Sequence, residues 1–258
     1  MQNLNVAVIQ STLAWEDIEA NLNHLDSFFS DLKKETDLVV LPEMFSTSFS
    51  MNPMPIAEKL EDSKAIAWMQ AKAQKHNIAI VGSLIIQEGN DYFNRMIWME
   101  ADGIKGQYDK RHLFRLTHEE EVFTGGNKRS IVEYKNWRFN LNICYDLRFP
   151  VWARNKGDYD VLVYVANWPA KRQYAWSTLL KARAIENQAF VLGCNRVGVD
   201  GNEHKYNGFS AIIDYAGNVL EEKDSEEGIL YQTLEKGAYL HFRESFPFHM
   251  DGDQFTIH

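Results

Sequence analysis

A layered α/β fold is the class that this sequence predicts, and three observations lead to it. Continuous apolar runs of strand length occur at residues 38–41 and 161–165, and such runs are typical of strands covered on both faces. Residues 18–32 repeat apolar side chains every three or four positions, as a helix packed along one face does. The chain therefore opens as strand, helix and covered strand. With 258 residues, 45% of them hydrophobic, it is long enough to bury a large core as one domain.

The other elements follow from the same patterns in chain order. Asp102-Gly103 and Ala216-Gly217-Asn218 are typical of hairpin turns between strands. No linker or repeat divides the chain, so we expect one domain over residues 1–235. The remaining tail, 236–258, contains four phenylalanines and should dock on the core or on a partner subunit. The expected helices are 18–32, 63–76 and 174–188, and the expected strands are 4–9, 38–41, 78–86, 94–99, 106–108, 130–134, 138–143, 161–165, 189–195, 210–214 and 228–234.

Composition limits the possible partners and compartment. The formal net charge of −9 argues against nucleic acid as a partner, because a phosphate-binding surface needs a basic field. No apolar run approaches the roughly 18 residues that cross a bilayer, and the start of the chain does not resemble a secretory leader. We therefore expect a soluble, cytoplasmic protein. The two cysteines, Cys144 and Cys194, lack metal-ligand spacing, and the disulfide that they could form is disfavoured in the cytosol.

One stretch, residues 139–150, suggests a reactive thiol. Phe139, Leu141 and Ile143 alternate with two asparagines, as in a strand with one apolar face. If the strand continues to Cys144, its thiol lies on the asparagine face, away from the apolar packing surface. Pro150 then ends the strand pattern. The alternative is an inert buried cysteine, which is common.

Two further polar residues follow strand ends in the same way. Glu43 comes two residues after the apolar run 38–41; it is either a solvated loop carboxylate or a general base. Lys110 begins a basic run after the expected strand 106–108. This run is either a solvent-exposed surface or the source of one ammonium held in a site. Residues 166–169 end the run 161–165 with the same layout as residues 38–43.

Together these residues resemble the nitrilase superfamily of carbon-nitrogen hydrolases, and within it the bacterial omega-amidases. The resemblance implies a four-layer α-β-β-α sandwich, a homodimer, and neither metal nor organic cofactor. It also implies a small-molecule substrate, the ω-amide of a 2-oxo acid such as α-ketoglutaramate or α-ketosuccinamate, cleaved to the acid and ammonia. The matching segments are Leu41-Pro42-Glu43, residues 108–114, residues 143–150, Ala166-Asn167-Trp168-Pro169, residues 183–188, 193–198 and 207–210, and Met44-Phe45-Ser46-Thr47.

The same resemblance assigns a catalytic set. Cys144 would attack the amide and form a thioester, Glu43 would move the proton, and Lys110 with a backbone N–H near Tyr145 would stabilise the oxyanion. A further glutamate fits the pattern Glu-x-x-x-Phe-x-x-Gly at Glu119, where it would orient the substrate or the lysine. Residues 119–121 are all glutamate, and a run of acidic residues usually lies on a solvent-exposed face.

Substrate contacts are less defined. Four aromatic side chains are expected to wall the cavity: Phe45, Phe49, Tyr145 and Trp168. The loop that carries the first two could equally cover the core. Arg115, Lys171 or Arg172 could bind the substrate carboxylate, and we expect Arg148 to pair with a buried acid, Asp146 or Glu186.

Three alternatives remain at this stage. The same triad could act on another small amide, a nitrile or a carbamoyl compound. The scaffold could instead be a non-catalytic binding protein. A cysteine protease with His112 or His118 as base is disfavoured, because the flanking residues do not match the papain-like pattern. We expect Cys194 to be a core residue.

Overall fold

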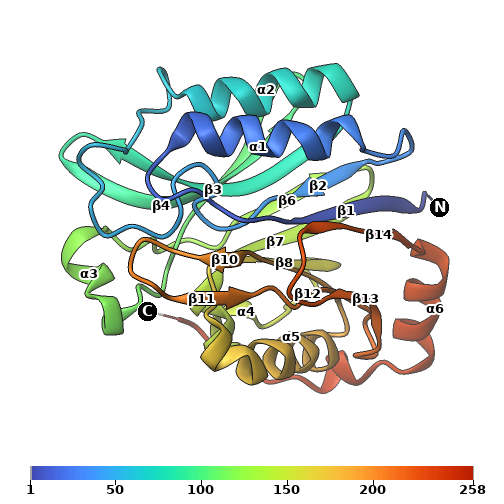
Figure 1. Cartoon of the computed structure of the whole chain (residues 1–258). Helices are drawn as coiled ribbons and strands as arrows, with labels where there is room; N and C mark the ends of the chain where they lie inside the picture. Colours follow the sequence, from blue (N-terminus) through green and yellow to red (C-terminus); the bar gives the residue numbers. More distant parts are fainter. Residues whose placement is uncertain (1, 258) are drawn as a thin grey trace.

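The computed structural model, which describes residues 2–257, has four layers, with two facing β-sheets between outer helices (Figure 1). Each sheet has six strands. The predicted α-β-β-α sandwich is therefore confirmed. The packing of the two sheets places carboxyl ends of parallel strands from both near one another, and such ends are where layered α/β proteins bind ligands.

In the first sheet, β1, β2 and β3 run parallel and antiparallel strands flank them, in the order β14-β1-β2-β3-β4-β5. β2 is short, and Leu38, Val39 and Val40 are all buried, as expected of a strand between two neighbours and two layers. The strands are β1 (Leu4–Gln10), β2 (Leu38–Val40), β3 (Ala79–Glu88), β4 (Asp91–Glu100), β5 (Gly103–Asp109) and β14 (Gly228–Leu234).

The second sheet repeats this plan, in the order β13-β12-β9-β8-β7-β6, with β7, β8 and β9 parallel. A separate hairpin of β10 (Val197–Val199) and β11 (Lys205–Asn207) extends from β9. The strands of the second sheet are β6 (Ile131–Tyr134), β7 (Trp137–Ile143), β8 (Val161–Ala166), β9 (Phe190–Asn195), β12 (Ser210–Ile213) and β13 (Val219–Lys223).

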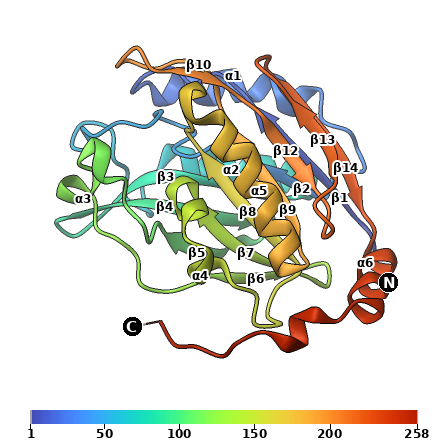
Figure 2. The same cartoon turned by 90° about the horizontal axis from the view of Figure 1, so that it is seen from below.

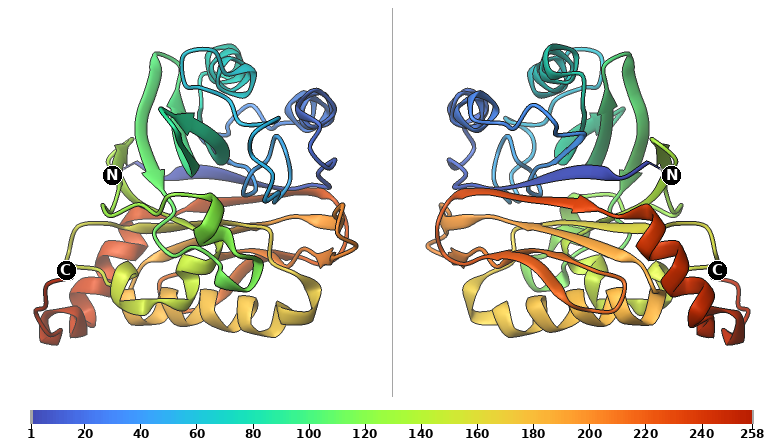
Figure 3. Two further views of the ribbon diagram at one scale, coloured as in Figure 1. Left: turned by 90° about the vertical axis from the view of Figure 1, so that its left-hand side faces the viewer. Right: turned by 90° about the vertical axis from the view of Figure 1, so that its right-hand side faces the viewer.

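Helices cover the outer face of each sheet (Figure 3). α1 (Ile18–Ser30) and α2 (Lys64–His76) lie on the first sheet, and α4 (Pro150–Ala153) and α5 (Gln173–Asn187) lie on the second. Asp17 and Ser63 cap α1 and α2, each by accepting a backbone N–H with its side chain. These caps explain why both helices begin where the apolar periodicity begins.

The largest apolar cluster lies between the two sheets. Val40 of the first sheet and Leu141 and Val163 of the second are fully buried there. The rings of Trp98 and Phe139 meet across the interface with centroids 4.7 Å apart. Burial of this kind contributes about 25 cal/mol per Å² of apolar surface, so the inter-sheet layer holds the strand ends of the two sheets in a fixed relation.

The segment after β14 forms a helix, α6 (Lys236–Ser245), that residue patterning did not predict. Its Tyr239 is buried against Trp137 and Phe190. Beyond α6 the chain runs along one side of the body (Figure 2), and Lys156 donates a 3.1 Å hydrogen bond to the carbonyl oxygen of Phe255. The tail thus contacts the body of its own chain, while a domain boundary at residue 235 stays a prediction. Among residues 2–257, no helix is long and apolar enough to cross a bilayer.

Candidate active site

Four polar side chains meet where strands of both sheets end. Glu43 follows β2, Lys110 follows β5, Cys144 follows β7 and Asn167 follows β8. Parallel strands bring their carboxyl ends to the same edge of a sheet, and the packing of the two sheets brings these edges together. Residues far apart in the sequence therefore surround one end of a cavity.

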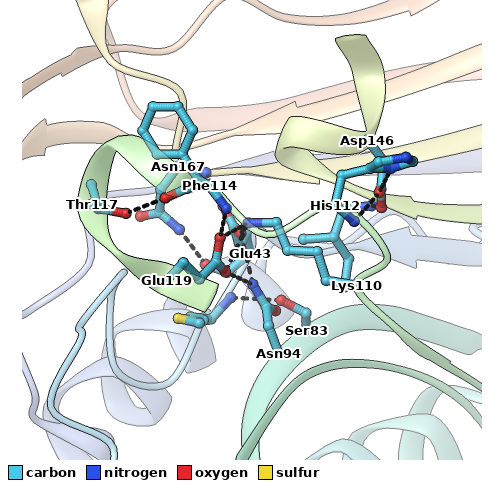
Figure 4. A network of polar contacts seen from close by, with 12 residues as sticks. Glu43, Ser83, Asn94, Lys110, His112, Phe114, Thr117, Glu119, Asp146 and Asn167 are labelled. Atoms are coloured by element: carbon cyan, nitrogen blue, oxygen red, sulfur yellow. Dashed lines mark hydrogen bonds and ion pairs between the residues drawn. The ribbon is translucent and has the colours of Figure 1, made fainter. Parts of the chain in front are cut away.

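Lys110 lies between two carboxylates (Figure 4). Its Nζ is 2.9 Å from Oε1 of Glu43 and 2.9 Å from both carboxylate oxygens of Glu119. The side chains of all three residues are fully buried. Burial alone would lower the pKa of Lys110, but the charges of Glu119 and Glu43 outweigh burial and hold this pKa above its ordinary value. Lys110 is therefore an ammonium throughout the physiological pH range.

Glu119 is the one member of the acidic run that enters this cluster. It begins the short helix α3 (Glu119–Val122) and is fully buried, whereas the next two glutamates are half-buried and exposed. The backbone N–H of Phe114 donates to its Oε2 at 2.6 Å. Burial raises the pKa of Glu119 and the charge of Glu43 adds to this, while Lys110 opposes both. Two carboxylates thus share one ammonium.

Two asparagines that we did not predict as site residues orient Glu43. Nδ2 of Asn94 donates to Oε1 of Glu43 at 2.8 Å, and the backbone N–H of Asn167 donates to Oε2 at 2.7 Å. Nδ2 of Asn167 also donates to the carbonyl oxygen of Glu43 at 2.6 Å. The shared layout of residues 38–43 and 166–169 was a signal for Asn167, whereas Asn94 carries no such signal.

Cys144 lies directly after the strand that leads to it. β7 ends at Ile143, and Cys144 has φ of 44° at the start of a 3₁₀ turn, Cys144–Arg148. The condition for the expected orientation, a strand that continues to Cys144, is therefore not met, and a left-handed backbone at this residue directs the thiol instead. Asp146 stabilises the turn by accepting the backbone N–H of Ile143 at 2.9 Å and that of His112 at 3.0 Å.

The thiol is protonated at rest. Burial raises the pKa of Cys144 well above its ordinary value, and the charge of Glu43 raises it further, although Lys110 acts in the opposite direction. A thiol in this state is a weak nucleophile unless a base removes its proton as it attacks.

A cavity of about 450 Å³ opens onto Cys144 and Lys110. Phe49, Tyr145 and Trp168 line it, as predicted. Phe45 does not, and this prediction is corrected: Phe45 is fully buried between the first sheet and its helices, where its ring contacts that of Trp68. The loop 44–55 thus serves both purposes that its apolar residues suggested, covering the core at Phe45 and lining the cavity at Phe49.

The cations at the cavity differ in part from those expected. Lys171 and Arg172 line it, but Arg115 is outside its lining and pairs with Glu120 at 3.3 Å. Arg148 also lines it and lies over the ring of Trp168 at 5.1 Å.

Arg148 pairs with neither acid that we expected, and that prediction is wrong. Asp146 accepts hydrogen bonds from Tyr108 and His112, and Glu186 pairs with Arg183 at 2.9 Å, one turn away on α5. With both acids engaged by nearer donors, the guanidinium of Arg148 extends toward the cavity.

The remaining candidate residues have structural partners. Cys194 is fully buried in the core, and both cysteines are free thiols. His112 lies 2.7 Å from Asp146 through Nδ1, and His118 pairs with Glu121 on the surface. Within residues 2–257, no group of three or more histidine, cysteine or acidic side chains is arranged to hold a metal ion.

Known proteins match this chain over almost its whole length. The family model for carbon-nitrogen hydrolases matches residues 5–240. Omega-amidase YafV of Escherichia coli strain K12 is 43% identical over 258 residues, covering 100% of both chains. The 2-oxoglutaramate amidase of Bacillus subtilis is 33% identical, covering 94% of this chain and 95% of that protein. Among solved structures, XC1258 of Xanthomonas campestris, a CN-hydrolase superfamily protein with an arsenic adduct in its active site, has a TM-score of 0.97 at 40% identity and covers 100% of both chains.

Proposed function

Because this chain belongs to the carbon-nitrogen hydrolase family, we propose that its amide hydrolysis is carried out by Cys144, Glu43 and Lys110 through a thioester. The protein is an amide-cleaving hydrolase, and its activity is that of an omega-amidase. The observation that carries the residue assignment is the buried Lys110, held 2.9 Å from both Glu43 and Glu119 beside a cavity that Cys144 lines.

In the first half-reaction, Sγ of Cys144 attacks the carbonyl carbon of the substrate amide while Glu43 takes the thiol proton. The tetrahedral intermediate collapses when the C–N bond breaks and Glu43 returns the proton to nitrogen, so that ammonia leaves and the thioester remains. In the second, Glu43 takes a proton from the attacking water and the thiol is regenerated. The overall reaction consumes one water and yields the acid and ammonia.

Lys110 supports this sequence electrostatically. Its ammonium stabilises the oxyanion, and a backbone N–H at the start of the turn, near Tyr145, is the second donor. When Glu43 takes the proton it becomes neutral, so its hydrogen bond to Nζ weakens and that N–H becomes available to the oxyanion. Glu119 holds the ammonium in place throughout, with both carboxylate oxygens 2.9 Å from Nζ.

The substrate that we propose is a 2-oxo acid ω-amide, on which the relatives' names agree: omega-amidase and 2-oxoglutaramate amidase. Its carboxylate needs a cation, and Arg148, Lys171 and Arg172 line the cavity. Arg172 lies over the ring of Phe114 at 5.1 Å, as Arg148 does over Trp168. Stacking of this kind leaves the N–H edges of a guanidinium free for a carboxylate.

The test combines one variant with a substrate panel. Cys144→Ala should abolish ammonia release from α-ketoglutaramate while circular dichroism shows an unchanged fold, and retained turnover would contradict the mechanism. The panel compares kcat/KM of the wild type for ω-amides of 2-oxo acids, carboxylate-free amides, nitriles and carbamoyl compounds. Preference for a member outside the first group would replace the proposed substrate without removing the triad.

We also propose that the protein is a cytoplasmic homodimer. A catalytic thiol must stay reduced, which the cytosol provides. Val151, Tyr174 and Ile185 on α4 and α5 leave large apolar side chains exposed, with 55%, 82% and 50% of each residue accessible, and a second copy could cover them. Light scattering at micromolar concentration tests the assembly, and a monomer mass would contradict it.

A further inference from the structure

We propose that Oδ1 of Asn167 accepts a hydrogen bond from the N–H of the substrate amide and, after C–N cleavage, from the departing ammonia. This role goes beyond the triad and rests on the proposed function of the site. Asn167 follows β8 and lines the cavity together with Cys144 and Lys110. It would make the enzyme selective for the leaving group as well as for the acyl group.

The NH₂ group of the Asn167 side-chain amide fixes the orientation of that amide. Nδ2 donates to the carbonyl oxygen of Glu43 at 2.6 Å. A carbonyl oxygen accepts hydrogen bonds and cannot donate them, so the nitrogen of the amide must be the atom that faces it. The oxygen of Asn167 is therefore turned away from this carbonyl oxygen. Among the described residues 2–257, this buried oxygen has no hydrogen-bond partner.

The nearby acceptors are already engaged. Oε1 of Glu43 accepts hydrogen bonds from Asn94 and Lys110, and Oε2 accepts one from the backbone N–H of Asn167. Both carboxylate oxygens of Glu119 accept hydrogen bonds from Lys110, and one also accepts the backbone N–H of Phe114. A primary amide brings two N–H groups into this region, and burying them without acceptors is costly. Among residues 2–257, Oδ1 of Asn167 is a buried acceptor with no partner, as is Oδ1 of Asn94 beside Glu43.

Burial strengthens the case. Lys110 and Asn167 are only 1% and 4% exposed although both line the cavity, so bulk water reaches little of either side chain. Buried polar atoms are normally paired, and a substrate N–H would pair this one.

The product would bind differently. The acid formed by hydrolysis is an ionised carboxylate with acceptors only, so it has no proton to offer Oδ1 and its charge faces a carbonyl dipole. Oδ1 of Asn167 would thus favour binding of the amide and lower the affinity for the acid product. An ester of the same acid likewise lacks the N–H, so the amide-to-ester ratio isolates this contact.

The experiment measures kcat/KM for an ω-amide and the matched ω-methyl ester of the same 2-oxo acid. Asn167→Ala and Asn167→Leu should lower the amide-to-ester ratio of kcat/KM by about tenfold, because only the amide uses Oδ1. Equal losses on both substrates would show that Asn167 acts only by holding Glu43, and would overturn the proposal. The matched control is Asn195→Ala, since Asn195 binds the N–H and carbonyl of Trp168 in the same loop; its ratio should stay that of the wild type.

A second measurement does not depend on these variants folding. In Cys144→Ala, which cannot turn over, calorimetry should show the amide binding about tenfold more tightly than the methyl ester. Equal affinities would contradict the inference. If wild-type enzyme does not hydrolyse the ω-amide, the proposed substrate fails by itself, and the same amide and ester comparison, made with an amide that the enzyme does hydrolyse, still decides the role of Asn167.

Discussion

Replacing Glu119 by glutamine tests whether this residue orients the catalytic ammonium. Both oxygens of Glu119 receive Lys110 at 2.9 Å, and one also receives the backbone N–H of Phe114 at 2.6 Å. The NH₂ of glutamine would face one of these donors, so at least one hydrogen bond to a charged group is lost. Such bonds are worth about 2 to 3 kcal/mol, which corresponds to a loss of roughly 30- to 150-fold in kcat/KM.

The assay is ammonia release from α-ketoglutaramate, with folding checked by circular dichroism. Glu121→Gln is the matched control, because Glu121 belongs to the same acidic run but is 68% exposed and pairs only with His118. Its kcat/KM should stay within about twofold of wild type, since an exposed pair contributes little. Near-wild-type activity of Glu119→Gln, or an equal loss in Glu121→Gln, would refute the assignment of Glu119.

Three further outcomes follow from the structure. In Glu43→Gln, the rate of alkylation of Cys144 by iodoacetamide at pH 7 should fall about 100-fold. This rate should continue to increase with pH above 8.5, because burial still raises the pKa of the thiol. A wild-type rate at pH 7 would exclude Glu43 as the base. Asp160→Asn should lower the free energy of unfolding in urea at pH 7 by about 3 kcal/mol. Burial alone would raise the pKa of Asp160, but hydrogen bonds, chiefly from Arg138, lower it. The stabilisation by the ionised Asp160 is therefore present above pH 3.8 and is lost as pH falls through the lower pKa of the folded state. A difference in unfolding free energy between the two proteins that persists in acid would contradict this. Tyr239→Ala removes a ring packed within 6.1 Å of three others and should cost about 3 to 4 kcal/mol in the same assay, whereas a loss below about 1 kcal/mol would mean that α6 is not docked in solution.

The elements that sequence patterns predicted best are those whose burial is uniform along the chain. Residues 38–41 and 161–165 read as covered strands because both faces of β2 and β8 meet apolar layers. The short hairpin β10–β11 and the helix α3 were not predicted, since elements of three or four residues are too short to show a period. Helix α6 was not predicted either, because the aromatic residues of residues 236–258 indicated only that this segment docks on the protein.

Among site residues, Phe45 and Arg148 show why local patterns were insufficient. Phe45 and Phe49 lie in one apolar loop, yet the first packs beneath the sheet and the second faces the cavity. Arg148 had two plausible acidic partners: Asp146 accepts from Tyr108 and His112 of another segment, and Glu186 pairs with Arg183 on its own helix. The pairing within α5 follows from the spacing of the two residues, whereas the positions of Phe45 and of the donors to Asp146 depend on groups that meet only in three dimensions.

The chain by itself determined the layered α/β class, the placement of Glu43, Lys110 and Cys144 just after strand ends, and the motifs that resemble one hydrolase family. These are properties of neighbouring residues, set by strand pattern and local backbone chemistry. Only the tertiary structure decided that two sheets bring Glu43 and Lys110 to 2.9 Å, that one of three glutamates is buried, and that Oδ1 of Asn167 has no partner among residues 2–257. The contacts of Glu43 with Lys110 and Asn167 join segments 67 and 124 residues apart in the chain, and the packing of the two sheets sets their distances.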